Sequence, residues 1–443
     1  MNKKKISPYV IIILGFIGLI LIGSLLLMLP FATYNHVSLS YIDALFTATS
    51  AVCVTGLSAV PTLAGTYTLF GKIVIAILME IGGLGFVTIV IFIFTLLGLK
   101  IGIQDRFLIK ESLNQNSLKG IVKLVRFTVF VTLIVQTLGA IINFLVFNRY
   151  FSFGKALGIS VFHAISSFNN AGFDLFTEGT SLIPYQNPLL LINTAVLIVI
   201  GGIGFIVIND IITNKSWKKL SVHSKIVLLT SLCLIVFGAL ILKLLEWNNI
   251  TWMQAFFTSV AARTAGFAVV DFNTITSSAL IVVMALMYIG ASPASTGGGV
   301  KTTTFYTVIK YISSFARGRL PLTFKRRIAT GSVIKAFILV VFSLTFIFLA
   351  IFALTLTEQK HLLATATTDN LERIVFEVFS AFGTVGNSMG ITAHLTWGSK
   401  LIICLTMFFG RLGPITIISA WNRNWNIDAN VGIKYLEEKM IIG

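Results

Sequence analysis

The sequence predicts an all-α polytopic membrane protein, with four pseudo-symmetric helix–re-entrant loop–helix units around one pore and eight transmembrane helices. The first observation is composition: of 443 residues, 56% are hydrophobic and 11% charged, and the mean hydropathy is +0.93. Soluble proteins of this size carry more charge. The second is a short glycine motif that occurs four times between apolar stretches. The third is that lysines and arginines cluster between those stretches.

The expected transmembrane helices are apolar stretches near or above the ~20 residues that cross a bilayer. They lie at 9–33, 69–99, 120–148, 187–213, 226–246, 279–315, 333–357 and 399–420. The first stretch follows Lys3-Lys4-Lys5 and lacks a small-residue cleavage site. We therefore expect it to remain as a helix and not to be removed as a signal peptide.

Four weaker stretches, one within each successive pair of spans, are too short to cross a bilayer, which predicts re-entrant helices. They lie at 41–54, 161–170, 252–262 and 372–383. The motif glycines that follow them, Gly56, Gly172, Gly266 and Gly386, are each followed 24 to 29 residues later by a second glycine landmark: Gly82, Gly201, Gly290 and Gly410. This internal repeat divides the chain into units 9–99, 120–213, 226–315 and 333–420, between an N-terminal segment 1–8 and a tail 421–443.

The net charge of +17 is concentrated in the linkers between units, at 100–126, 215–225 and 310–327. This distribution is typical of cytoplasmic loops, so we expect a multi-pass protein of the cell membrane with both termini in the cytoplasm. It leaves little excess charge for nucleic-acid binding, which we do not expect. Cys53, Cys233 and Cys404 have no metal-binding or disulfide spacing.

The four glycine motifs predict a cation site. Glycine adopts positive φ without steric cost, so it allows the sharp turn that points backbone carbonyls at one axis. Rings of such carbonyls replace the water around potassium in channels. Four unrelated glycine turns in packed loops are the alternative. The predicted filter residues, with K+ as their only metal, are Val54, Thr55, Gly56, Asn170, Ala171, Gly172, Thr264, Ala265, Gly266, Thr384, Val385 and Gly386.

A gate is predicted within the stretch 279–315, which is too long for one crossing. Proline and three successive glycines break a helix at 290–301, and broken helices at membrane depth usually line a cavity. Arg411, a charge inside the last span, is expected to bond the carbonyls of this loop. A tolerated kink and a structural arginine are the alternatives. The predicted gating residues are Gly290, Ser292, Pro293, Ser295, Thr296, Gly297, Gly298, Gly299, Lys301 and Arg411.

The four motifs, together with the Phe-Gly-Arg-Leu-Gly-Pro segment at 409–414, resemble the Trk/Ktr/HKT superfamily of potassium transporters, and most of all the bacterial Ktr membrane (pore) subunit. The resemblance implies potassium selectivity through Gly56, a homodimer with one pore in each subunit, and a cytoplasmic nucleotide-binding regulatory ring. It also implies an intramembrane gating loop at 290–301. Asn387 departs from the family pattern, in which a hydrophobic residue is expected after the fourth glycine.

We therefore expect potassium uptake through a gated pore. The alternative is a secondary transporter, a symporter that couples potassium to sodium or protons, because such proteins also have helices broken at the midplane. No enzyme is expected: the sequence lacks HExxH, GxSxG, GxxxxGK[ST] and dinucleotide motifs. No cofactor is expected beyond transported K+, with Na+ as an activator or co-ion left open. Membrane lipid would surround the chain.

Overall fold

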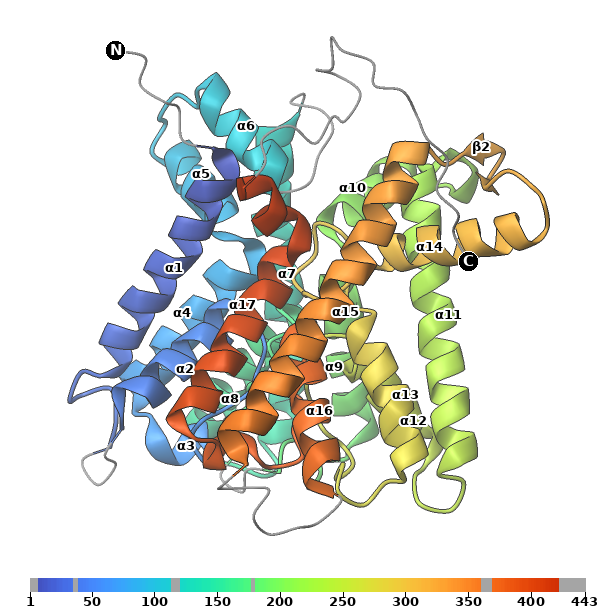
Figure 1. Ribbon diagram of the computed structural model, residues 1–443. Helices are drawn as coiled ribbons and strands as arrows, with labels where there is room; N and C mark the ends of the chain where they lie inside the picture. The colour runs from blue at the N-terminus through green and yellow to red at the C-terminus, as the bar shows by residue number, and fades with distance from the viewer. Residues whose placement is uncertain (1–6, 35–38, 113–119, 177–179, 360–368, 422–443) are drawn as a thin grey trace.

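The computed structural model describes residues 7–34, 39–112, 120–176, 180–359 and 369–421 (Figure 1). Nearly all of the predicted tail at 421–443, and most of the N-terminal segment 1–8, lie outside these residues. The described chain is mostly helical. Its two short strands, β1 (Leu322–Thr323) and β2 (Arg326–Arg327), form one small hairpin.

Five described helices are long and apolar enough to cross a bilayer. Most of their surface is apolar and turned away from the protein interior, as expected of helices that contact lipid. They are α1 (Pro8–Leu27), α7 (Ile121–Phe147), α11 (Val222–Leu245), α15 (Thr330–Glu358) and α17 (Trp397–Trp421).

The other three predicted spans are broken. The break within 279–315 agrees with the expectation, whereas the breaks within 69–99 and 187–213 were not predicted. α4 (Leu69–Leu84) and α5 (Phe86–Leu96) meet at 96°, and α9 (Pro188–Ile203) and α10 (Phe205–Asn214) meet at 93°. The stretch 279–315 forms α13 (Ser277–Tyr288) and α14 (Thr302–Ala316), separated by the predicted loop.

Glycine explains the first two of these breaks and a similar kink within α17 at Gly413. Gly85, Gly204 and Gly413 have φ of 85°, 98° and 76°, with ψ of 132°, 137° and 148°. This conformation is outside the helical region and strongly favours glycine. Each lies three residues after one of the landmark glycines, so the second helix of three predicted units breaks at the same place.

Four short helices lie between the long ones: α2 (Tyr41–Val52), α8 (Phe153–Phe168), α12 (Trp252–Ala261) and α16 (Asp369–Gly383). Two have side-chain caps that explain where they begin. Ser40 accepts a hydrogen bond from the Asp43 amide at 3.1 Å, and Thr251 and Gln254 form a capping box. The remaining short elements are α3 (Leu63–Thr66), α6 (Ile103–Ser112), η1 (Trp217–Lys219) and η3 (Thr392–His394).

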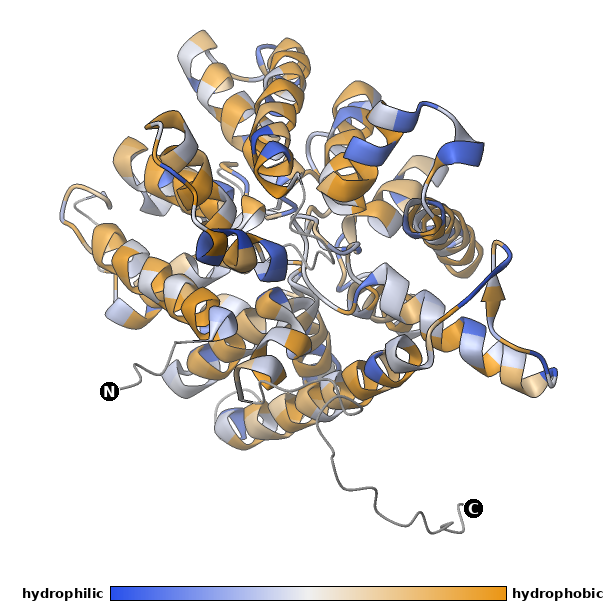
Figure 2. Cartoon of the chain, turned by 90° about the horizontal axis from the view of Figure 1, so that it is seen from above, coloured by the Kyte–Doolittle hydropathy of each residue, from blue (hydrophilic) through white to orange (hydrophobic). Residues whose placement is uncertain are grey.

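The helices close into a ring. Contacts run from α2 to α4, α8, α9, α12, α13, α16 and α17, and α17 returns to α2. The Lys400 ammonium lies 2.7 Å from the Asp43 carboxylate and joins α17 to α2 at this seam. Figure 2 shows helices made largely of hydrophobic residues, arranged around a centre through which loops pass. Loops at the centre of a helical ring are allowed where they line a cavity or are buried in protein.

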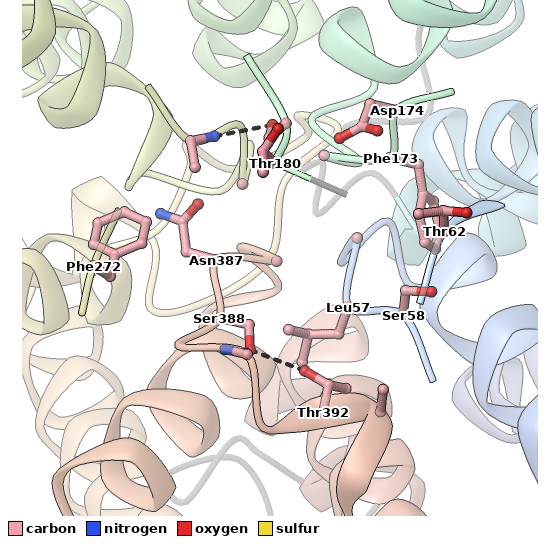
Figure 3. Close-up of a pocket in the computed structure, with 18 of the residues that line it drawn as sticks. Leu57, Ser58, Thr62, Phe173, Asp174, Thr180, Phe272, Asn387, Ser388 and Thr392 are labelled. Atoms are coloured by element: carbon pink, nitrogen blue, oxygen red, sulfur yellow. Dashed lines mark hydrogen bonds between the residues drawn. The ribbon is translucent and has the colours of Figure 1, made fainter. Parts of the chain in front are cut away.

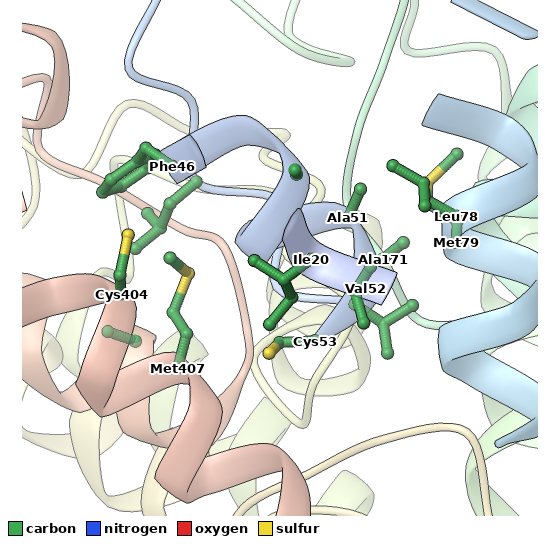
Figure 4. Packing of buried hydrophobic residues seen from close by; sticks show 14 of the residues in the cluster. Ile20, Phe46, Ala51, Val52, Cys53, Leu78, Met79, Ala171, Cys404 and Met407 are labelled. Atoms are coloured by element: carbon green, nitrogen blue, oxygen red, sulfur yellow. The ribbon is translucent and has the colours of Figure 1, made fainter. Parts of the chain in front are cut away.

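The largest buried cluster fills the space between α1, α2, α4 and α17. Val52 and Cys53 at the end of α2 lie in this cluster with Met79 of α4 and Met407 of α17 (Figure 4). All four side chains are fully buried. This packing fixes the end of α2, and therefore the position of the backbone that follows it.

Candidate functional site

Four backbone turns follow directly after the four short helices, and they contain all twelve predicted filter residues. We call residues 54–56, 170–172, 264–266 and 384–386 the four turns. Each begins within three residues of the end of α2, α8, α12 or α16. The carbonyl end of a helix carries partial negative charge. Four such ends therefore meet at the centre of the ring.

Each turn begins and ends in the left-handed region. The glycines Gly56, Gly172, Gly266 and Gly386 have φ of 92°, 72°, 69° and 101°, in agreement with the reason given for glycine at these positions. The first residues of the turns, Val54, Asn170, Thr264 and Thr384, also have positive φ, at 52°, 58°, 100° and 49°.

Positive φ at the four non-glycine residues was not predicted. For a β-branched residue such as Val54 it is a strained conformation that costs about 1–3 kcal/mol and is found mainly at functional sites. The middle residue of each turn has ordinary φ. Such an alternation lets neighbouring carbonyls point to the same side.

The four turns lie against one another in a closed cycle. A Cβ added to Gly56 would come closer than 3.0 Å to the Ala171 carbonyl oxygen, and one on Gly172 would lie 2.7 Å from the Ala265 oxygen. One on Gly266 would overlap the Val385 oxygen, and one on Gly386 would overlap the Thr55 oxygen. Each glycine therefore faces the carbonyl of the next turn, and the last faces the first.

Hydrogen bonds fix the turns. The Gly56 amide donates to Ser50 Oγ, and the Gly386 amide donates to Ser380 Oγ, both at 3.0 Å. The Asn170 side chain lies 2.8 Å from Thr264 Oγ1 and so links the second and third turns. Because these side chains are buried, the turns are held in place before any ligand arrives.

A cavity of ≈ 490 Å³ opens on one side of the turns. Its lining includes all four turn glycines, Asp174, Asp271 and Asn387 (Figure 3). Among the described lining residues none is lysine or arginine. Burial raises the pKa of Asp174 to about 6. The cavity is therefore suited to cations rather than anions at neutral pH.

The loop at 290–301 lies on the other side of the turns. Gly298 donates its amide to Thr384 Oγ1 at 2.9 Å, and a Cβ on Gly297 would overlap Thr264 Oγ1. The loop thus contacts the first residues of the third and fourth turns, whereas the cavity contacts their glycines. The Lys301 ammonium donates back to the Gly297 carbonyl at 2.7 Å.

Backbone hydrogen bonds join the loop to two other spans, close to the positions where those spans break. The Ser292 and Thr296 amides donate to the Gly202 and Gly201 carbonyls at 3.0 and 3.2 Å. The Gly299 amide donates to the Gly410 carbonyl at 3.2 Å.

Further contacts involve the remaining predicted gating residues. The Pro293 oxygen lies 2.6 Å from a Cβ built on Gly204, Gly290 packs against Gly298, and Ser295 Oγ donates to the Ser292 oxygen at 2.6 Å.

Arg411 connects the loop to a third break. One guanidinium nitrogen donates to the Thr296 carbonyl, and the other donates to the Gly82 and Gly83 carbonyls, the latter at 2.9 Å. The contact with the loop is the one expected from the sequence. The contact with the break of the first unit was not predicted. The repeat could have indicated it, because Gly82, which accepts this bond, is one of the landmark glycines.

Sequence and fold comparisons agree with one another. The sequence profile of the TrkH family, described as cation transport proteins, matches residues 5–426. The chain is 40% identical to Ktr system potassium uptake protein B of Bacillus subtilis, over 94% of this chain and 93% of that protein. It is 39% identical to potassium/sodium uptake protein NtpJ of Enterococcus hirae, over 100% and 98%. The crystal structure of the potassium transporter TrkH from Vibrio parahaemolyticus has the same fold, with a TM-score of 0.72 at 17% identity, covering 96% of this chain and 87% of that one.

Proposed function

Because this chain belongs to the TrkH family of cation transport proteins, we propose that it admits potassium ions to the cell through a pathway formed within a single chain. Membership in this family makes the protein a membrane transporter and not an enzyme. Relatives that are 40% and 39% identical are named for uptake of potassium and of potassium or sodium. The proposal extends that activity to this chain.

The closed cycle of the four turns is the observation that carries the proposal. A cation that leaves water needs oxygen ligands from several directions. Four turns that each face the next can supply backbone carbonyls around one axis. We propose that the twelve residues of the turns form the selectivity filter, and that the four successions of long helix, short helix, turn and broken helix are the repeat units.

In the proposed mechanism a potassium ion enters the cavity, where Asp174 and Asp271 raise the local cation concentration. It loses water at the four turns, where four helix carbonyl ends favour positive charge. It then meets the loop at 290–301, which acts as the gate. An inside-negative potential contributes about 2.3 kcal/mol per charge per 100 mV in the inward direction.

The proposed orientation places the cavity outside. The three basic linkers include α6, η1 and β2. In Figure 1, α5, α6, α10 and β2 gather at one end, and α3, whose Leu63 lines the cavity, lies at the other. Positive charge favours the cytoplasmic side. We also propose that a nucleotide-binding regulatory ring binds this basic face, because a relative of this chain is named as part of a Ktr system. Separately, we propose that the chain forms a homodimer.

The second candidate is uptake coupled to sodium or protons, and it is favoured by the relative that is named for potassium and sodium. Strict dependence of potassium uptake on a second ion, without single-channel currents, would support it over a channel-like pore.

The test is rescue of a potassium-uptake-deficient bacterium at low external potassium, with the regulatory partner co-expressed. Rescue is expected for the unmodified chain. Gly56→Ser places a side chain against the Ala171 oxygen at a φ of 92°, and we expect it to weaken both potassium uptake and the preference for potassium over sodium. Failure of the unmodified chain to rescue, at confirmed membrane expression, would refute the proposal.

A further inference from the structure

Asn387 is a buried amide without a hydrogen-bond partner. Its side chain is 2% exposed, and neither Oδ1 nor Nδ2 is bonded to any described residue. Buried polar groups in folded proteins are nearly always paired, so such an exception calls for an explanation. Two other buried asparagines, Asn143 and Asn193, bond each other at 2.8 Å.

The position of Asn387 makes this exception informative. It directly follows Gly386 and lines the cavity above the four turns. Figure 3 shows it beside Phe272, across the opening from Ser58 and Thr62. The residues after the other three turn glycines are Leu57, Phe173 and Phe267, all buried and apolar. Only one of the four equivalent positions therefore carries a side-chain oxygen.

The surroundings favour a cation over an anion. Asp174 and Asp271 line the same cavity, and none of its described lining residues is lysine or arginine. A neutral amide oxygen is a good ligand for small monovalent cations, as are the backbone carbonyls next to it. Neither amide atom is accessible to water in this side-chain conformation, so the side chain has to rotate toward the cavity before Oδ1 contacts an ion or Nδ2 contacts water.

We propose that Asn387 Oδ1 is a ligand of a monovalent-cation site at the floor of the cavity, in front of the four turns. The ion at this site keeps part of its water and takes one oxygen from the Asn387 side chain. The site loads the filter and sets the external concentration at which uptake is half-maximal. This inference rests on the proposed transport function, which it deepens by adding a side-chain ligand to a pathway otherwise made of backbone.

Two substitutions at this position test the inference. Asn387→Leu gives the residue found after the first turn glycine and removes the oxygen with little change in size. Asn387→Asp keeps an oxygen ligand and adds negative charge. Ser58→Ala is the matched control, because Ser58 lines the same cavity but its hydroxyl already donates to the Val60 oxygen at 2.8 Å.

The full chain is reconstituted with its regulatory partner in liposomes, and uptake is measured while external K+ or Na+ is titrated at pH 7.5. Loss of one oxygen ligand is expected to raise the half-saturating concentration roughly three- to tenfold in Asn387→Leu. Asn387→Asp is expected to lower it, and Ser58→Ala to leave it unchanged. The ion whose half-saturation shifts more is the ion that the site prefers.

Thermal stabilisation of the detergent-solubilised chain by KCl and NaCl is measured in parallel, so that binding is read without transport. Equal half-saturation and equal ion stabilisation in Asn387→Leu and the unmodified chain would overturn the inference and assign the amide to water alone. If Asn387→Leu does not fold, an unchanged or raised half-saturation in Asn387→Asp overturns it. If the unmodified chain transports no potassium, the proposed function fails, and the stabilisation measurement still decides whether Asn387 binds an ion.

Discussion

Arg411 is the residue whose replacement tests the gating mechanism most directly. Its guanidinium donates to the Thr296 carbonyl in the loop and to the Gly82 and Gly83 carbonyls at the break between α4 and α5. It therefore fastens the loop to a fixed part of the ring. Arg411→Ala removes this connection and also removes a positive charge from the neighbourhood of the proposed ion path.

The size of the effect follows from the bond to the loop. A hydrogen bond that involves a charged group contributes about 1.5–3 kcal/mol. Of the bonds that Arg411 makes, only the one to Thr296 reaches the loop. Its loss therefore shifts the equilibrium between the closed and the open loop toward the open one by a factor of roughly 10 to 150. The loop keeps its bonds to Gly201, Gly202, Thr384 and Gly410, which limits the shift. We expect potassium flux to rise at least severalfold.

The assay is potassium or rubidium flux into liposomes, with the amount of inserted protein matched and folding checked by gel filtration. Arg411→Lys serves as the comparison, because it keeps the positive charge but has a single ammonium that cannot bridge both sets of carbonyls. If hydrogen bonds hold the loop, this variant also shows raised flux. Unchanged or reduced flux in a folded Arg411→Ala protein would contradict the role assigned to the bond with Thr296.

Three further predictions concern the turns, the cavity and the seam of the ring. Gly386→Ala places a Cβ against the Thr55 oxygen at a φ of 101°, so uptake should fall at least tenfold; Gly390→Ala, at a φ of 84° with nothing within 4 Å, is the control, and equal losses in both would contradict the argument. Because burial raises the pKa of Asp174 to about 6, its charge is present at pH 7.5 and lost as the pH falls below 6. The external potassium concentration at half-maximal uptake should therefore rise on acidification in the unmodified chain. It should also rise in His394→Gln, a control at another residue that lines the cavity, but not in Asp174→Asn. A pH effect that survives in Asp174→Asn would refute this. Lys400→Met removes one partner of a largely buried ion pair with Asp43 and should destabilise the protein by more than about 1 kcal/mol in thermal unfolding, whereas a smaller loss would show that the seam does not depend on this pair.

The sequence predicted the features that depend on local chemistry. The apolar stretches, the short helices between them and the glycine turns follow from hydropathy and from the conformational freedom of glycine. α2 and α12 lie within two residues of their predicted bounds, whereas α8 begins at Phe153, eight residues before the predicted start. The turns at 54–56 and 384–386 meet although they are far apart in sequence, as expected for four turns around one axis.

Features that depend on tertiary contacts were missed. The sequence repeat identifies the landmark glycines at 82, 201 and 410, but it does not predict that helices break three residues later at 85, 204 and 413, because an isolated glycine in an apolar helix is usually tolerated. The positive φ of Val54, Asn170, Thr264 and Thr384 had no signal in residue type, since these residues ordinarily avoid it. Only the packing of neighbouring turns imposes that conformation.

The Glu246 and Glu358 carboxylates form a second repeated contact that could not be predicted from the sequence. Each lies at the end of a long helix and accepts hydrogen bonds from the amide and hydroxyl of a threonine that begins a later one, Thr276 or Thr396. The two arrangements match, but the spacings differ, at 30 and 38 residues. A repeat search based on fixed intervals therefore cannot detect them.

The contact between Gly386 and Thr55 has a consequence for biosynthesis. The first turn leaves the ribosome more than three hundred residues before the turn that completes it, and α17, which returns to α2, is the last of the described helices to be made. Until then the nascent chain has an open, polar flank at bilayer depth, where unpaired backbone is costly. Chains that stop before residue 386 should therefore be substrates for membrane quality control, and the insertion machinery would have to shield the unfinished wall while translation continues.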